Sequence, residues 1–136
     1  MTAIEAIRQY FMDCPLLDAE ARINVNYIGV EPLEYIIYSD PMDPIYKRYS
    51  DGGVIKQYGF TFATLNYHSP EVIQQLENSG FYEDFSRWIE ENNKKGALPE
   101  VDGAQRIEVL TNGYLLNAEA DRGQYQIQLK LLYLEV

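Results

Sequence analysis

The sequence contains very little of the chemistry from which catalytic and metal sites are usually built. Its 136 residues include one cysteine and one histidine. A single cysteine excludes an intrachain disulfide, and a lone histidine excludes the common zinc-binding patterns. Glycine-rich phosphate loops and the motif of a nucleophile elbow are also missing. The sequence therefore gives no positive sign of an enzyme, and we expect no resident cofactor or metal.

Basic residues and long apolar runs are scarce as well. Lysine and arginine number 11 against 21 acidic residues, which gives a formal net charge of −10 at pH 7. A chain with this charge is expected to bind neither nucleic acid nor anionic membranes. No apolar run approaches the roughly 20 residues of a membrane span. Residues 1–5 lack the basic and apolar regions of a signal peptide, so we expect the chain to be cytoplasmic where it is made.

Apolar and aromatic residues, by contrast, are abundant, and tyrosine is in excess. The apolar fraction is 46%, and twelve tyrosines stand against five phenylalanines and one tryptophan. This content excludes a disordered chain, and the length predicts a single domain over residues 1–136. Tyrosine has an apolar body and a polar tip, so the excess suits surfaces that become buried against partners. The alternative is that tyrosine simply fills strands well.

The clearest secondary-structure pattern lies near the end of the sequence. Apolar and polar residues alternate strictly over residues 125–131, which predicts a strand with one buried and one solvated face. Both faces become apolar from Leu132 to Leu134. We expect these last residues to be covered on both sides, either by the chain itself or by a partner.

The same alternation predicts further strands, separated by turn residues. They cover residues 23–27, 33–38, 45–50, 54–67 and 105–117. Residues 51–53 (Asp-Gly-Gly) predict a hairpin turn before the longest strand. In that strand Tyr58, Phe60 and Phe62 share one face, which we expect to pack against a helix. The apolar pattern changes phase at residues 112–113 (Asn-Gly), and we favour a bulge in one long strand over a hairpin turn.

Helical periodicity appears in two places. Apolar residues recur at spacings of three and four over residues 2–13, where Thr2 and Glu5 predict a capping box. A second helical region is predicted over residues 69–95, with a break or kink at residues 78–80 (Asn-Ser-Gly). The predicted fold class is α+β: a mixed, mainly antiparallel curved sheet of about five to six strands packed against an N-terminal helix and a kinked central helix.

Four residues with reactive or metal-binding side chains are expected to be structural. Cys14 has no histidine or lysine near it in sequence that would lower its pKa, so a buried small residue is expected. His68 precedes a helix start and has no nucleophile motif beside it, so no catalytic role is expected. Asp40 and Asp43 each directly precede a proline and have too few oxygen ligands around them for a calcium loop, so a solvated loop is expected there.

The order of these elements, together with several short segments, resembles a family of small minor capsid or minor tail proteins of long-tailed bacteriophages and prophages. The segments are residues 47–52 (KRYSDG), 57–62 (QYGFTF), 81–90 (FYEDFSRWIE), 98–99 (LP), 111–114 (TNGY) and 124–129 (QYQIQL). The resemblance covers most of the chain from about Arg22 onward. The architecture is also similar to that of tail terminator proteins. That similarity implies an α+β subunit that forms a hexameric ring on the finished tail tube, stops its growth and presents a surface for the head.

The resemblance also implies partners and a location. The expected partners are further copies of the chain, the tail tube protein and a head completion or connector protein. The expected location is the virion tail, assembled in the host bacterial cytoplasm. Candidate subunit contacts lie in residues 39–58, at the strand edge near residues 112–124 and at the apolar end of the last strand. The candidate residues are Tyr49, Asp51, Tyr58, Tyr114, Leu132 and Leu134.

Two other classes of protein remain open at this point. One is a small-molecule-binding or enzymatic α+β domain of the cystatin-like kind, with a helix packed on a curved sheet. The other is an acidic inhibitor or immunity protein, whose charge of −10 would mimic nucleic acid for a basic enzyme. A ligand that copurifies with the protein would favour the first class, and salt-sensitive binding to a basic nuclease would favour the second.

Overall fold

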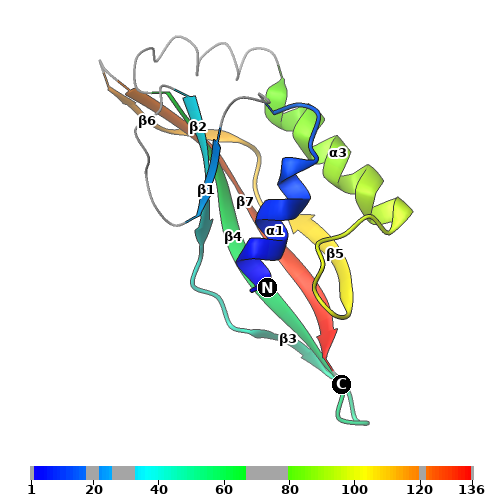
Figure 1. The fold of residues 1–136 in the computed structure, drawn as a ribbon. Coiled ribbons are helices and arrows are strands. Elements are labelled where there is room, and N and C mark those ends of the chain that lie inside the picture. Colours follow the sequence, from blue (N-terminus) through cyan, green and yellow to red (C-terminus); the bar gives the residue numbers. More distant parts are fainter. Residues whose placement is uncertain (1, 18–21, 26–32, 67–79, 120–121, 136) are drawn as a thin grey trace.

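The computed structural model describes residues 2–17, 22–25, 33–66, 80–119 and 122–135. Their helices and strands appear in Figure 1 in order along the chain. They are α1 (Ala3–Met12), β1 (Arg22–Val25), β2 (Leu33–Ser39), β3 (Ile45–Arg48), β4 (Val54–Asn66), α3 (Phe81–Lys95), β5 (Ala104–Val109), β6 (Tyr114–Glu119) and β7 (Arg122–Glu135). The predicted strand over residues 23–27 is observed as β1, and its last two residues lie outside the described part.

The two longest strands, β4 and β7, form the centre of a single sheet. They pair antiparallel from Val54–Glu135 at one end to Asn66–Gly123 at the other. β2 and β3 follow one another along the outer side of β4, and β5 and β6 follow one another along the outer side of β7. β1 extends the sheet by pairing parallel with β2.

This topology confirms the predicted α+β class with a mixed, mainly antiparallel sheet. The described sheet has seven strands where about five to six were predicted, because the predicted strand over residues 105–117 is divided into β5 and β6. Measured across its width, the path β1-β2-β4-β7-β5 contains five strands. Figure 1 shows the sheet strongly twisted, with α1 and α3 on the same face.

The core lies between these two helices and the sheet, and it is built largely from aromatic rings. Phe11 of α1 stacks on Phe85 of α3 with ring centroids 5.3 Å apart, and Phe85 lies 4.8 Å from Phe62 of β4. Phe60 and Phe62 are fully buried and Tyr58 packs at the margin of the same cluster. The prediction that this face of the longest strand packs against a helix is therefore confirmed.

The helix ends follow the capping chemistry expected from the sequence. The N–H of Glu5 donates to Oγ1 of Thr2 at 3.3 Å, which confirms the N-cap of α1. Gly80, with φ 73°, directly precedes α3, and Gly96, with φ 74°, ends it. The predicted helix before the break, and His68 with it, lie outside the described residues. Neither described helix has the length and apolar character needed to cross a membrane.

The residues expected to be structural have that role wherever they are described. Cys14 is buried in the core cluster, and its burial raises the pKa of the thiol. The carboxylate of Asp40 accepts a hydrogen bond from Oγ1 of Thr61 at 2.6 Å, and that of Asp43 accepts one from the N–H of Ile45 at 2.9 Å. Asp40 therefore ties the loop to β4, and Asp43 binds the first residue of β3. No group of acidic, histidine or cysteine residues in the described ranges could hold a metal ion.

The phase change at residues 112–113 is an interruption of the sheet edge and not a hairpin turn. β5 ends at Val109 opposite Leu129, and β6 begins at Tyr114 opposite Gln126, so both strands run in the same direction along β7. Between the two strands, four residues of this sheet edge, 110–113, lie opposite only two residues of β7. This is the bulge that the sequence favoured, widened until it divides one predicted strand into two.

Candidate functional site

The hairpin of β3 and β4, here called the arm (residues 45–56), projects from the end of the sheet where the C-terminus lies (Figure 1). Its turn is closed by hydrogen bonds. The N–H of Tyr49 donates to the carbonyl of Gly53 at 2.8 Å, and the N–H of Gly53 donates to the Asp51 carboxylate at 3.0 Å. Gly52 supplies the positive φ, 96°, that the turn requires. The strand predicted to Ser50 ends two residues earlier because Tyr49 already belongs to this turn.

The arm carries exposed aromatic and cationic side chains. Tyr46 is 48% exposed and Tyr49 is 43% exposed, and Lys47 and Arg48 are exposed between them. The Lys47 ammonium lies 5.1 Å from the centre of the Tyr49 ring. Within the described part of the chain, neither Lys47 nor Arg48 forms an ion pair. On a protein of net charge −10, this is a local concentration of positive charge.

Lys130 of β7 fixes the base of the arm to the sheet. Its side chain is only 13% exposed. The Lys130 ammonium lies 4.6 Å from the centre of the Tyr46 ring, 3.1 Å from Oε1 of Gln57 and 3.6 Å from a carboxylate oxygen of Glu108. Gln57 in turn donates to the carbonyl of Asp43 at 2.8 Å. The arm therefore leaves the sheet on a base that is held by polar contacts on several sides.

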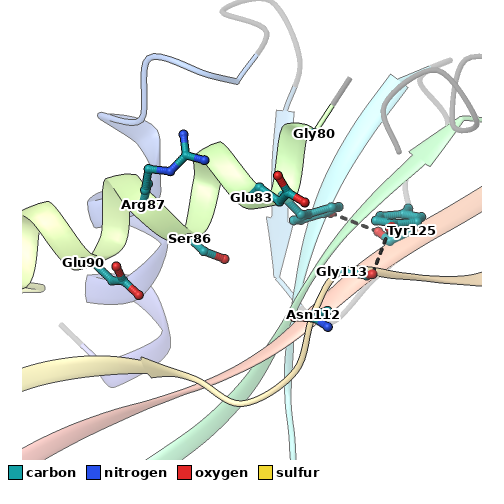
Figure 2. Close-up of a pocket in the computed structure, with 9 residues that line it drawn as sticks. Gly80, Glu83, Ser86, Arg87, Glu90, Asn112, Gly113 and Tyr125 are labelled. Carbon is teal, nitrogen blue, oxygen red and sulfur yellow. Dashed lines mark hydrogen bonds between the residues drawn. The ribbon is translucent and has the colours of Figure 1, made fainter. Parts of the chain in front are cut away.

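A first groove, here called the α3 groove, runs beside the first turns of α3 and encloses about 500 Å³ (Figure 2). Its floor is Tyr82, whose hydroxyl donates to the carbonyl of Tyr125 at 3.0 Å and therefore accepts from Oγ1 of Thr64, 2.8 Å away. The Tyr125 hydroxyl donates to the carbonyl of Gly113 at 2.8 Å. Burial raises the pKa of Tyr82 far above its usual value, so this hydroxyl stays protonated and has a structural role.

The rim of the α3 groove is polar and carries two carboxylates. Glu83 and Glu90 are seven residues apart on the helix, a rise of roughly 10 Å, and Ser86 lies between them. Arg87 forms an ion pair with Asp84, with the guanidinium nitrogen and the carboxylate oxygen 2.9 Å apart. Ser86 stands three residues after Glu83 and four before Glu90, and the described residues that line this groove include no histidine or cysteine.

A second groove, here called the α1 groove, lies between α1 and residues 97–100 and encloses about 420 Å³. Its aromatic floor consists of Tyr10 and Trp88, with ring centroids 5.0 Å apart. The Tyr10 hydroxyl accepts a hydrogen bond from Nδ2 of Asn92 at 3.2 Å, and burial raises its pKa to about 12. The exposed carboxylates of Asp13 and Glu100 stand on the rim, and neither has a cationic partner among the described residues.

The structure divides the six sequence-predicted contact residues between surface and interior. Tyr49 and Asp51 lie on the arm, and the side chains of Tyr49 and Leu134 both approach Gly53, so these two are brought together. Leu134 is half-buried, and its N–H donates to the carbonyl of Gly103 at 2.8 Å.

The other three predicted contacts lie inside the fold or at its margin. Tyr58 is half-buried and hydrogen-bonded to the hydroxyl of Ser39, and Tyr114 is half-buried and accepts from Nε2 of Gln126 at 2.6 Å. Leu132 is 1% exposed and so offers no surface to another subunit in this structure. The sequence left open whether Leu132 is covered by the chain itself or by a partner, and in this structure the chain itself covers it.

The α1 groove is the feature that sequence reasoning misses. The helical spacing of Tyr10 and Trp88 indicates only that each lies on the apolar side of its helix. The groove exists because α1 and the loop after α3 do not close over these two rings. The arm has a clearer signal, since Tyr46-Lys47-Arg48-Tyr49 places two cations between aromatic residues in an acidic chain.

Comparison with known proteins adds no family assignment. No model of a known protein family matches the sequence, and a search of curated proteins finds no significant match.

Proposed function

We propose that the protein is a structural subunit of the tail of a long-tailed bacteriophage or prophage and that it acts as a tail terminator. In this role, copies of the chain form a ring on the finished tail tube, stop its growth and present a surface that joins the tail to the head. The ring is a hexamer, the number that the resemblance to tail terminators implies.

The observation that carries the proposal is the arm. A basic and aromatic projection on an acidic subunit is suited to a protein that must bind other subunits, because exposed tyrosine and arginine are enriched where surfaces become buried. The arm is anchored at its base by Lys130, so little conformational freedom is lost when it binds. A contact between two different surfaces of identical subunits produces a ring when the rotation closes.

Two further properties support a structural role. A net charge of −10 suits a ring through which DNA passes, because an acidic lumen repels the phosphate backbone and does not hold it. The α+β subunit with its open sheet agrees with the architecture that the resemblance implies. In this proposal the protein is not an enzyme and uses no cofactor. Its partners are its own copies, the tail tube protein and the head completion protein, and it resides in the virion tail after synthesis in the host cytoplasm.

The test is deletion of this gene from an inducible prophage, followed by electron microscopy of the particles. Overlong tails beside tailless, DNA-filled heads are expected, and a plasmid copy of the gene should restore the normal tail length. Tails of normal length that are correctly joined to heads would overturn the proposal.

A further inference from the structure

We infer that the arm of one copy docks into the α1 groove of the next copy. This inference rests on the proposed function, because it specifies which two surfaces make the contact that a ring requires. It assigns the occupant of the groove as a second copy of this chain, bound through Lys47 and Arg48 and the tyrosines beside them.

Charge complementarity points to this pairing. Asp13 and Glu100 stand on the rim of the α1 groove, and none of the described residues that line it is a lysine or an arginine. Lys47 and Arg48 are the exposed cations of the arm, since Lys56 is already paired with Glu135 at 2.6 Å. The groove carries two unpaired anions, and the arm carries two unpaired cations, one on each face of β3 because consecutive strand residues point to opposite sides. This opposition of charge gives the contact both a sign and a direction.

The floor of the groove suits the same occupant. Tyr10 and Trp88 present neighbouring rings, and the faces of tryptophan and tyrosine attract an arginine or lysine cation. Pro99 is buried beside them, and Leu98 is half-buried, so the groove also offers apolar surface for a tyrosine ring of the arm. A groove with an aromatic floor and an acidic rim therefore matches an arm that places two basic residues between two tyrosines.

The positions of the two surfaces make the contact head-to-tail. The arm extends beyond the end of the sheet, away from α1 and α3, whereas the groove lies among the helices (Figure 1). Two different surfaces on one subunit can bind simultaneously to two neighbours. Such a heterologous contact gives a closed ring or an open filament, and it does not stop at a dimer.

Other described surfaces fit the arm less well. The α3 groove also carries two carboxylates, Glu83 and Glu90, but it places the guanidinium of Arg87 between them, whereas the α1 groove has no cation among its described lining residues. The edge of β5 is occupied at its centre, because the Asn93 carboxamide forms hydrogen bonds with both the N–H and the carbonyl of Ile107. A sheet that continues from β3 of one copy to β5 of the next would first have to displace Asn93.

The decisive experiment uses charge reversal and mixing. One variant carries Lys47→Glu with Arg48→Glu, and a second carries Asp13→Lys with Glu100→Lys. Sedimentation equilibrium from about 1 µM to 1 mM should show self-association of the natural chain, weakened at least about tenfold in each variant. In a one-to-one mixture, each natural arm meets a natural groove and each reversed arm meets a reversed groove. Association should therefore return in the mixture to within about threefold of the natural chain.

Matched controls separate this contact from general charge effects. Lys94→Glu with Lys95→Glu gives the same net charge as the arm variant, and Glu90→Lys with Glu91→Lys gives the same net charge as the groove variant. Both pairs are exposed on α3, outside the arm and the α1 groove. Each control should associate within about threefold of the natural chain. Three results would each overturn the inference. The natural chain could stay monomeric, a control could weaken association as much as the charge reversals do, or the mixture could fail to recover association.

Cross-linking tests the direction of the contact. Ser50→Cys places a thiol at the tip of the arm and Ala97→Cys places one beside the groove, while the natural Cys14 is buried. A short bifunctional thiol reagent should join the two variants when they are mixed and should join neither variant to itself. Products of equal yield in the unmixed samples would contradict a head-to-tail contact.

Failure of the inference differs from failure of the proposed function. If deletion gives overlong tails but the arm variant still associates and restores tail length, the terminator role stands and the arm–groove contact is wrong. If deletion leaves tails normal but the mixing experiment succeeds, copies of the chain do associate through arm and groove, and the ring serves another purpose.

Discussion

The carboxamide of Asn93 forms two hydrogen bonds with the backbone of Ile107. Nδ2 donates to the Ile107 carbonyl at 2.9 Å, and Oδ1 accepts from the Ile107 N–H at 3.0 Å. A neighbouring strand would make the same pair of bonds, so a side chain from α3 completes the outer edge of β5. An unpaired edge is a template for pairing with another chain. This contact joins the helix layer to the sheet, and it also protects the edge of β5 from pairing with another chain.

Removing this contact should weaken the fold and expose the edge. Asn93→Ala leaves the partly buried N–H and carbonyl of Ile107 without partners, so the free energy of unfolding should fall by about 1–3 kcal/mol. Urea denaturation measures the loss, and Lys94→Ala, at the exposed next position of α3, is the control. Light scattering on heating should also rise earlier in Asn93→Ala. Equal stability of the two variants would show that water replaces the carboxamide without cost.

Gly103 and Gly96 offer a matched pair that separates backbone strain from steric conflict. Their φ angles are nearly the same, 77° and 74°. A Cβ at Gly103 would lie 2.1 Å from the carbonyl oxygen of Leu134, whereas a Cβ at Gly96 would meet nothing within 4 Å. Gly96→Ala should therefore cost about 1 kcal/mol for the left-handed backbone alone.

Gly103→Ala should cost about 3 kcal/mol, because the end of β7 must also move away from the new methyl group. The difference between the two midpoints of urea unfolding isolates the close approach of Gly103 to Leu134. Equal losses in the two variants would mean that the loop before β5 shifts freely. In that case the half-buried end of β7 would not depend on this contact.

Tyr82 is the residue through which α3, β4 and β7 share hydrogen bonds. Tyr82→Phe removes the donor to the Tyr125 carbonyl and the acceptor for Thr64, so the free energy of unfolding should fall by about 1–3 kcal/mol. Thr64→Val should also destabilise the protein. In the double variant, the loss should be smaller than the sum of the single losses by about 0.5 kcal/mol or more, because the Tyr82–Thr64 bond is removed only once. Additive losses would contradict the shared hydrogen bond.

Local patterns predict most of the elements, because local physics determines them. Strict alternation predicts β7, and the aromatic face of β4 predicts the helix that covers it. Thr2 identifies the start of α1 through a capping bond that needs only four consecutive residues. The number of strands was less predictable, since the division of the predicted strand over residues 105–117 into β5 and β6 depends on pairing with β7. That pairing is set by contacts between residues distant in sequence.

The candidate contact surfaces were only partly predictable for the same reason. The arm is continuous in sequence, and its turn and its basic segment are visible there. The α1 groove is made by α1, α3 and the following loop, and no local pattern places Tyr10 beside Trp88. For Leu132 the sequence predicted a contact surface that the structure does not show. Its apolar neighbourhood suggested a surface for a partner, but it is buried within the chain itself.

Tyr10 predicts how stability changes at high pH. Burial raises the pKa of its hydroxyl from 10.0 to about 12, and Asn92 donates a hydrogen bond to the same oxygen, which partly opposes the rise. The unfolded chain loses this proton near pH 10, whereas the folded chain holds it until about pH 12. The contribution of Tyr10 to stability is therefore complete below pH 10 and is lost as the pH rises through about 12.

The midpoint of urea unfolding should consequently fall between about pH 10 and pH 12, and Tyr10→Phe should make this fall shallower. Tyr82 contributes in the same direction, because burial raises its pKa as well, so the fall should not disappear completely. The exposed Tyr49→Phe is the control and should leave the slope unchanged. If Tyr10→Phe and Tyr49→Phe have the same slope as the natural chain, Tyr10 ionises in the folded protein as readily as in the unfolded one. The floor of the α1 groove would then be open to water, and an arm docked there would bury less apolar surface than the groove offers.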